Sequence, residues 1–413
     1  MSNASASPRS PSRARGATLA LASSLAAFPA CIHKASSPEM LTAQSGSARV
    51  DTLAPDRAGN PYAGADMFVN PDYRKAVLAV EQVAPQMKRE LELVANTSTA
   101  IWLDSIAKAE TISRYLDAAE DQRKHSAKPV VVTFVAYDLP NRDCAAKSSA
   151  GELAVDQNGE ALYQSSFIDP IARALEAYPH LRVVVVLEPD SLANLATNLG
   201  QPKCAASAGA YKHGVAYAIK KLHLPHVSLY LDAAHAGWLG WGGNRAKIGK
   251  VFKEVLDEAG GVDTIRGFAT NVSNYNVLHG DDGASLEPSN PCPDEMTYVN
   301  ELADSLRWAG ITGRGFIVDT SRNGQSGTRH RWGAWCNIAK AGLGERPRAE
   351  PEPLVDAYFW VKPPGESDGT SDKTQPRFDS ECVSRDSASN APQAGQFFTS
   401  HFLEMLTHAS PKL

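Results

Sequence analysis

Short, continuous apolar runs alternate along the chain with longer segments in which apolar residues recur at helical spacing. Seven runs are rich in β-branched or aromatic residues: 100–103, 130–136, 183–187, 227–231, 267–270, 316–318 and 358–361. A continuous run is typical of a parallel strand that is buried on both faces. The segments expected to be helices include 167–178, 206–222 and 296–309. Repeated β–α units predict an α/β fold with a parallel sheet, here a distorted seven-stranded parallel β/α barrel.

Polar side chains, many of them carboxylates, follow these runs directly. The C-terminal strand ends of such a barrel form the face that carries the active site. The side chains expected on this rim include Asp104, Asp138, Asp143, Glu188, Asp190, Asp232, His235, Asn271, Asn274, Asp319, Arg322, Lys362, Glu366 and Asp368. Because aspartate after a strand is also a favoured helix N-cap, we assign Asp104 and Asp319 to capping or structural ion pairs. The convergence of the others predicts a catalytic rim.

Four tryptophans lie at or just after the predicted strand ends, namely Trp102, Trp238, Trp241 and Trp335. Two of them share the stretch AGWLGWGGN, which we expect to be a glycine-rich loop rather than a helix. Sugar rings stack on flat aromatic rings while carboxylates, amides and lysine take the hydroxyl groups. Core packing is the alternative for any single tryptophan. Four beside acids on one rim favour sugar binding.

The N-terminus has the pattern of a targeting segment. Basic Arg9, Arg13 and Arg15 precede an apolar stretch over 17–28, and Cys31 follows shortly after. This order is typical of a signal peptide, so we expect a secreted or cell-surface protein. Lipid attachment at Cys31 is an alternative to plain cleavage. The expected parts are a signal peptide over 1–31, a linker over 32–59 and a catalytic domain over 60–413.

Composition narrows the function further. The net charge of -5 gives no basic face for nucleic acid. No apolar run in the body of the chain approaches the ~18 residues of a transmembrane helix. The histidines form no HExxH or His-x-His motif and the cysteines no CxxC motif, so we expect neither a metal site nor a cofactor. Five cysteines follow Cys31, so pairing in an oxidising compartment leaves one thiol over.

Eight stretches of the chain resemble glycoside hydrolase family six, a family of cellulases. They read AIWLDS, YDLPNRDC, VLEPDSLANL, YLDAAHAGWLGW, ATNVSNYN, VDTSRNGQSG, GAWCN and FWVKPPGESDGTSD, and the resemblance runs from about residue 60 to 406. It implies hydrolysis of β-1,4-glucosidic bonds in cellulose and cello-oligosaccharides with inversion at the anomeric carbon. An inverting enzyme needs its acid and base ~6.5–9.5 Å apart to admit a water molecule, and it needs no nucleophile.

The resemblance also implies catalytic roles. Asp190 matches the general acid, which requires a raised pKa. Asp143 matches the aspartate that supports this protonation, with a purely structural ion pair to Arg142 or Arg322 as the alternative. The other matches are Asp368, a candidate base acting through water, Asp232, a close electrostatic partner, Tyr137, which helps to distort the sugar ring, and Ser149, which helps to hold the water.

Substrate-binding residues and disulfides follow from the same resemblance. The substrate-binding matches are Trp102, Trp238, Trp241, Trp335, His235, Asn274, Lys362 and Glu366. A lone His235 is more often a structural histidine, but its place in DAAHAGW favours substrate binding. The implied disulfides are Cys144 with Cys204 and Cys336 with Cys382, which leaves Cys292 without a match. We expect a monomer, with cellulose or cello-oligosaccharides as its partner.

The mode of attack depends on one insert. Between Gly369 and Ala391 lies a long polar stretch that contains Cys382. It resembles the loop that roofs the site in exo-acting members, so we expect release of cellobiose from non-reducing ends. A mobile loop over an open cleft would instead give an endoglucanase. A carbohydrate-binding protein without catalysis is a more distant alternative, which the presence of Asp190 disfavours.

Overall fold

The structure is a computed structural model and describes residues 59–413. The predicted leader, Cys31 and nearly all of the predicted linker lie outside these residues. Within them, nine strands form one sheet. The strands are β1 Asp66–Met67, β2 Ile101–Leu103, β3 Val130–Ala136, β4 Arg182–Leu187, β5 Val227–Asp232, β6 Gly267–Thr270, β7 Gly315–Asp319, β8 Arg348–Glu352 and β9 Val355–Phe359.

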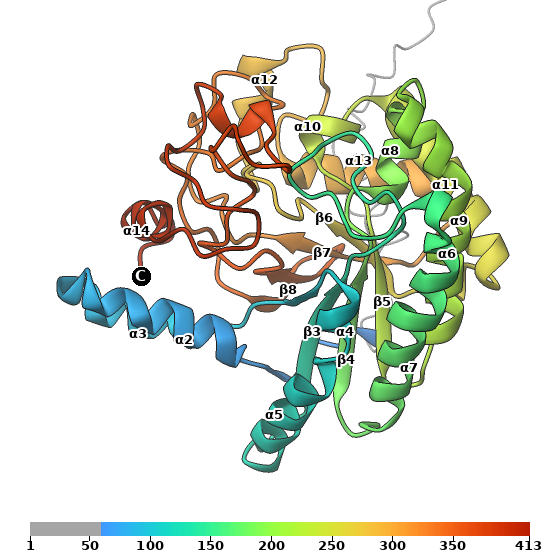
Figure 1. Cartoon of the computed structure of the whole chain (residues 1–413), viewed down its shortest axis with the longest axis horizontal. Helices are drawn as coiled ribbons and strands as arrows, with labels where there is room; N and C mark the ends of the chain where they lie inside the picture. Colours follow the sequence, from blue (N-terminus) through green and yellow to red (C-terminus); the bar gives the residue numbers. More distant parts are fainter. Residues whose placement is uncertain (1–58) are drawn as a thin grey trace, which may run out of the picture. The chain divides into compact units, whose positions relative to one another are not determined.

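Helices fill most of the connections and cover the outside of the curled sheet (Figure 1). The α-helices are α2 Pro71–Ala79, α3 Lys88–Ala95, α4 Ile106–Ala109, α5 Ile112–Lys124, α6 Gly159–Leu162, α7 Asp169–Glu176, α8 Ser191–Thr197, α9 Pro202–Leu222, α10 Ala236–Leu239, α11 Gly242–Ala259, α12 Asp282–Leu286, α13 Glu295–Trp308 and α14 Thr399–Thr407. The 3-10 helices are η2 Val80–Gln82, η3 Pro85–Met87, η4 Val155–Gln157, η6 Val262–Thr264 and η7 Ser380–Val383, and η5 Tyr163–Ile168 is a π-helix. No helix in the described part of the chain is both long and apolar enough to cross a membrane.

The predicted barrel is confirmed. Seven parallel strands follow one another in the order β2, β3, β4, β5, β6, β7 and β9. The two end strands are linked by a single parallel bridge between Thr99 and Trp360, so the barrel is nearly closed and distorted at this seam. The short strand β1 pairs with the first half of β3, and β2 pairs with its second half.

Strand β3 shows why the strand sequences are continuous apolar runs. All seven of its residues are buried. Val131 and Val135 belong to the cluster that fills the barrel, whereas Val132 and Phe134 belong to the cluster between the sheet and the helices. Successive side chains of a strand point to opposite faces, so burial on both faces requires apolar residues at every position.

Some predicted elements need correction. The run 358–361 was expected to be a strand, but β9 spans Val355–Phe359, and beyond it Trp360 makes only the single bridge to Thr99. Strand β8 was not predicted, since its partly exposed residues form an antiparallel edge. The stretch AGWLGWGGN is not a loop: Trp238 lies in α10, and Trp241 is the N-cap residue of α11.

Candidate active site

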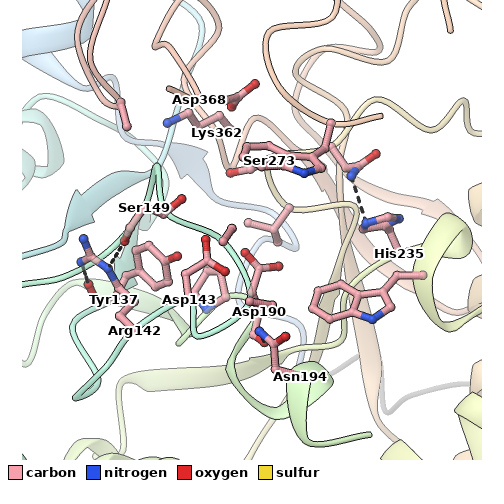
Figure 2. A pocket seen from close by; sticks show the side chains of 18 of the residues that line it. Tyr137, Arg142, Asp143, Ser149, Asp190, Asn194, His235, Ser273, Lys362 and Asp368 are labelled. Carbon is pink, nitrogen blue, oxygen red and sulfur yellow. Dashed lines mark hydrogen bonds between the residues drawn. The ribbon is translucent and has the colours of Figure 1, made fainter. Parts of the chain in front are cut away.

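One pocket of about 520 Å³ lies at the C-terminal ends of the strands. Its lining includes the predicted side chains Asp143, Asp190, Asp368, Tyr137, Ser149, Trp102, Trp238, Trp241, Trp335, His235, Asn274, Lys362 and Glu366. The structure therefore brings together every predicted catalytic and substrate-binding residue except Asp232. Figure 2 shows the Asp143 and Asp190 carboxylates projecting into the same space, with Lys362 and Asp368 across it.

Tight backbone turns aim these carboxylates. Asp143 and Asp190 both have left-handed backbone conformations, with φ of 50° and 65°. Such conformations are uncommon for residues other than glycine, and they cluster at functional sites. Asp190 is the N-cap residue of α8, yet its side chain makes no capping hydrogen bond. Its carboxylate therefore remains available to the pocket.

Burial and electrostatics favour the protonated form of Asp190. Burial raises the pKa of Asp190 well above its usual value, and the negative charges of Asp143 and Asp232 raise it further. Burial also raises the pKa of Asp143, although a hydrogen bond from Ser149 and the charge of Lys203 oppose this. The charge of Asp143 raises the pKa of Asp190, so ionisation of Asp143 favours the protonated form of Asp190.

Asp232 lies beneath the pocket rather than in its lining. Its Oδ2 atom accepts hydrogen bonds from the backbone N–H groups of Asp190 at 2.9 Å and Ala234 at 3.2 Å. The residue is buried. Asp232 thus supports the turn that carries Asp190 and adds negative charge behind it.

Asp368 has the opposite electrostatic environment. Its carboxylate accepts hydrogen bonds from Arg322 Nη1 at 2.8 Å, the hydroxyl of Tyr275 at 2.7 Å and the backbone N–H of Asn337 at 2.8 Å. Burial alone would raise the pKa of Asp368, but the charges of Arg322 and Lys362 and these hydrogen bonds hold it below its usual value. Asp368 is therefore ionised under conditions in which Asp190 is protonated.

Arg142 fixes the loop that carries Ser149. Its Nε donates to the carbonyl of Ser149 at 2.8 Å, and its Nη1 donates to the carbonyls of Asp104 at 2.7 Å and Tyr137 (Figure 2). Its nearest carboxylate is Asp138, at 3.5 Å. The alternative of an ion pair between Asp143 and Arg142 or Arg322 is not what the structure shows, because the two arginines pair with Asp138 and Asp368.

Two aromatic groups lie on either side of Asp190 in strand order. In β2, the Trp102 ring packs edge-on against Tyr137 with ring centroids 5.6 Å apart, and its Nε1 donates to the carbonyl of Val361 at 2.8 Å. After β5, the Trp238 Nε1 donates to Thr197 Oγ1 at 2.8 Å. These bonds hold the two rings in place, and both residues line the pocket. A chain of sugars between the two groups would pass Asp190, which follows β4.

His235 is held neutral by its surroundings. Its ring nitrogens lie 2.9 Å from Asn274 Nδ2 and 3.1 Å from Asn276 Nδ2. Burial, together with the charge of Arg329, lowers the pKa of His235 to about 3. Behind it, Glu295 Oε2 accepts from Asn276 Nδ2 at 3.3 Å. Both ring nitrogens already have an amide partner within the protein, so a sugar hydroxyl has to share or replace one of these contacts.

The remaining predicted acids are structural or paired. Asp104 forms an ion pair with Lys108 at 2.8 Å, as expected. Asp319 accepts from the backbone N–H groups of Ser273, Ser321 and Lys362, so it ties three loops together. Glu366 lies 3.4 Å from the Lys362 ammonium group in the pocket. Within residues 59–413, no cluster of His, Cys, Asp or Glu is arranged to hold a metal ion.

Several pocket residues were missed by the sequence analysis: Arg142, Asn194, Ser273 and Arg377. Asn194 follows Asp190 by one helical turn, and its Nδ2 donates to the carbonyl of Asp190 at 2.9 Å. Its place in VLEPDSLANL could have signalled this. No sequence signal could have shown that Arg377, in the long insert, reaches the pocket.

Both predicted disulfides are present, Cys144–Cys204 and Cys336–Cys382. Cys292 is a buried free thiol. The first disulfide fastens the loop after β3 to α9, and the second fastens the long insert to the loop that carries Trp335. Both loops contribute to the pocket, so the disulfides stabilise its walls.

A parallel β/α barrel whose pocket combines aspartates of opposite protonation with tryptophans and amides defines a glycoside hydrolase acting on a polysaccharide. The chain belongs to the glycosyl hydrolases family 6, whose sequence profile matches residues 62–409. The predicted resemblance is thereby confirmed.

The similar proteins agree with this assignment. An Aspergillus fumigatus protein named "Probable 1,4-beta-D-glucan cellobiohydrolase C" is 43% identical over 359 residues, which cover 86% of this chain and 79% of that one. The catalytic core of the cellobiohydrolase Cel6A from Chaetomium thermophilum has 40% identity and a TM-score of 0.83, covering 86% of this chain and 99% of that one. Cellobiohydrolase II (Cel6A) from Humicola insolens, in complex with glucose and cellotetraose, has 39% identity and a TM-score of 0.83, covering 86% and 100%.

Proposed function

We propose that the chain is an inverting cellulose 1,4-β-cellobiosidase that releases cellobiose from non-reducing chain ends. The observation that carries the proposal is the contrast between two aspartates facing one pocket. The pKa of Asp190 is raised, whereas that of Asp368 is lowered. Carboxyl groups whose environments push their pKa values apart are suited to separate acid and base roles.

Asp190 is the general acid in this proposal. Its proton passes to the glycosidic oxygen as the bond from that oxygen to the anomeric carbon breaks. Asp143 stabilises the positive charge that develops on the sugar and, through its own negative charge, the protonated form of Asp190. Tyr137 lies against Trp102 and under the Arg142 guanidinium, where its fixed ring can press on a distorted sugar.

Water attacks the anomeric carbon from the opposite face, and its proton must reach a base. Both oxygens of Asp368 already accept hydrogen bonds from protein donors, which makes this carboxylate a weak proton acceptor. We therefore assign it the end of a water chain rather than direct contact with the attacking water. Ser149, held by Arg142, is placed to orient that chain.

The contacts of the long insert support exo action. Arg377 Nε in the insert donates to the carbonyl of Ser148 at 2.8 Å, and Asp379 Oδ2 accepts from the backbone N–H of Lys147 at 3.0 Å. A Cβ atom at Gly369 would lie 2.6 Å from the Cβ of Ser148, so the two loops pack closely. The insert thus meets the Ser149 loop across the pocket, which favours a roofed site over an open cleft.

The similar proteins support the substrate. Three of them carry the name cellobiohydrolase, and one was solved with cellotetraose. By analogy, Trp102, Trp238, Trp241 and Trp335 would stack on glucose rings of this chain's substrate. The remaining hydroxyl partners are proposed to be His235, Asn274, Lys362 and Glu366.

The proposal also covers the location in which the enzyme acts. A signal peptide over 1–31 and a linker over 32–59 would deliver a catalytic domain over 60–413 to the outside of the cell as a monomer. The two disulfides support an oxidising destination. Lipid attachment at Cys31 stays a prediction.

Product analysis tests the proposed function. Purified enzyme is incubated with cellohexaose, and the anomer of the first product is followed by proton NMR. We expect cellobiose released as the α-anomer. Release of the β-anomer would contradict the inverting mechanism, and the absence of cleavage would contradict the assignment as a cellulase.

A further inference from the structure

Residues 287–292, here called the buttress, pack against the turn that carries Trp238 and Trp241. Asn290 Nδ2 donates to the carbonyl of Ala236 at 2.9 Å. A Cβ atom at Gly240 would lie 2.2 Å from Asn290 Oδ1, so no side chain fits at this position of the turn. The buttress therefore determines the path of the backbone between the two tryptophans.

The carbonyl of Gly240 is held from two sides. The Cys292 thiol donates to it at 3.2 Å, and Arg245 Nη1 donates to it as well. Arg245 is itself fixed by an ion pair with Glu301 at 2.9 Å. The free thiol of Cys292 therefore has a structural role, because it helps to hold the turn immediately before Trp241.

A hydrogen-bonded relay runs from the Trp241 ring into the buttress. The indole Nε1 donates to Ser289 Oγ at 3.2 Å, and the hydroxyl of Ser289 donates to Glu287 Oε1 at 2.6 Å. An indole N–H can only donate, a hydroxyl can accept and donate, and a carboxylate can only accept. The direction of the relay is therefore fixed. The Ser289 hydroxyl accepts from the indole N–H and so orients the Trp241 ring from its edge.

We propose that Ser289 and Glu287 are positioning residues for Trp241 and thereby determine how strongly the enzyme favours long β-glucan chains over short ones. The proposal rests on the proposed function, since it assumes that Trp241 stacks on a sugar. A ring held at its edge loses less conformational freedom on binding than a ring that rotates freely, so orientation improves affinity.

Strand order explains why chain length is the property affected. Trp102 lies in β2, and Asp190 follows β4. Trp238 and Trp241 both follow β5, but Trp238 is hydrogen-bonded to Thr197 in α8, the helix that Asp190 begins, whereas Trp241 is hydrogen-bonded to Ser289 in the buttress. A short oligosaccharide can span the acid while contacting only the Trp102 and Trp238 positions. A longer chain also reaches Trp241, so only the longer chain depends on the relay.

The test compares kcat/KM on cellotriose and cellohexaose for the wild type and the Ser289→Ala and Glu287→Gln variants. Loss of one hydrogen bond corresponds to a decrease of about 2- to 10-fold. We expect this decrease in Ser289→Ala on cellohexaose, through KM, with cellotriose unchanged. Ser285→Ala, at an exposed position of the preceding helix α12, is the matched control and should behave as the wild type on both substrates.

A double-mutant cycle separates positioning from general loosening. In a Trp241→Ala background, Ser289→Ala should cause no further loss on cellohexaose. An equal loss on both substrates, no loss on either, or a further loss in that background would overturn the inference while leaving the cellulase assignment intact. A wild type that cleaves neither oligosaccharide would overturn the proposed function and the inference together.

Discussion

The Oδ2 atom of Asp232 accepts a hydrogen bond from the backbone N–H of Asp190 at 2.9 Å. One buried carboxylate thus supports the turn of another. Asp190 has a left-handed backbone with φ of 65°, which the bond helps to hold. The negative charge of Asp232 also contributes to the raised pKa of Asp190. Asp232, which lies outside the pocket lining, therefore influences both the position and the protonation of the proposed acid Asp190.

Replacing Asp190 by Asn should abolish most turnover of unactivated β-glucan, because no proton reaches the glycosidic oxygen. General acid catalysis contributes about 10²–10⁴-fold. The loss should be much smaller on a cello-oligoside whose leaving group is a nitrophenol, which departs without protonation. Rates on both substrates, with oligosaccharide binding measured in parallel, check this. Equal losses on the two substrates would argue against Asp190 as the acid.

Replacing Asp143 by Asn should move the alkaline limb of the pH profile to lower pH. The charge of Asp143 is the largest electrostatic contribution that raises the pKa of Asp190. Without that charge the pKa of Asp190 falls, so the acid loses its proton at lower pH and kcat/KM declines sooner as pH rises. The residual kcat/KM is measured from pH 4 to 9. Asp257→Asn, on the exposed face of α11, is the control and should keep the wild-type limb.

The barrel could be predicted from the sequence because each strand is buried on both faces and leaves a continuous apolar run. Strand β8 could not, since its exposed edge has no such run. The aspartates of the rim could be predicted because parallel strands bring their C-terminal ends together. The supporting contacts could not: Asp232 was expected close to the site, but only the fold shows that it holds the backbone of Asp190. Asn276, Glu295 and Arg377 act through contacts between distant segments, which no local pattern records.

Stability should fall as pH rises, in part because of Glu295. This residue is buried beneath Ala236 and Asn276, and burial raises its pKa from 4.5 to about 7. A raised carboxyl pKa gives a stabilising contribution that is present below the unfolded value and is lost as pH rises through the folded one. The Tm of Glu295→Gln should therefore depend less on pH between 4.5 and 7 than that of the wild type. Thermal unfolding across this range tests it; Glu254→Gln, exposed on α11, should keep the wild-type slope.

The contact between the insert and the Ser149 loop predicts how the enzyme attacks a long chain. Arg377 donates to the carbonyl of Ser148 and lines the pocket, so it joins the two walls over the substrate. On amorphous cellulose, the wild type should release mostly soluble reducing ends and lower the viscosity of carboxymethyl cellulose only slowly.

Arg377→Ala should open the roof more often and so allow cuts within a chain. We expect a lower ratio of soluble to insoluble reducing ends and a faster fall in viscosity at equal total turnover. The ratio is compared at equal turnover because Arg377 also faces the pocket and its loss can slow catalysis. Lys373→Ala, exposed in the same insert, is the matched control. The Cys336–Cys382 disulfide still fastens the insert in both variants, so a change confined to Arg377→Ala isolates the contact with Ser148. A wild type that already gives a low soluble fraction with a rapid viscosity drop would contradict exo action and identify an endoglucanase of the same family.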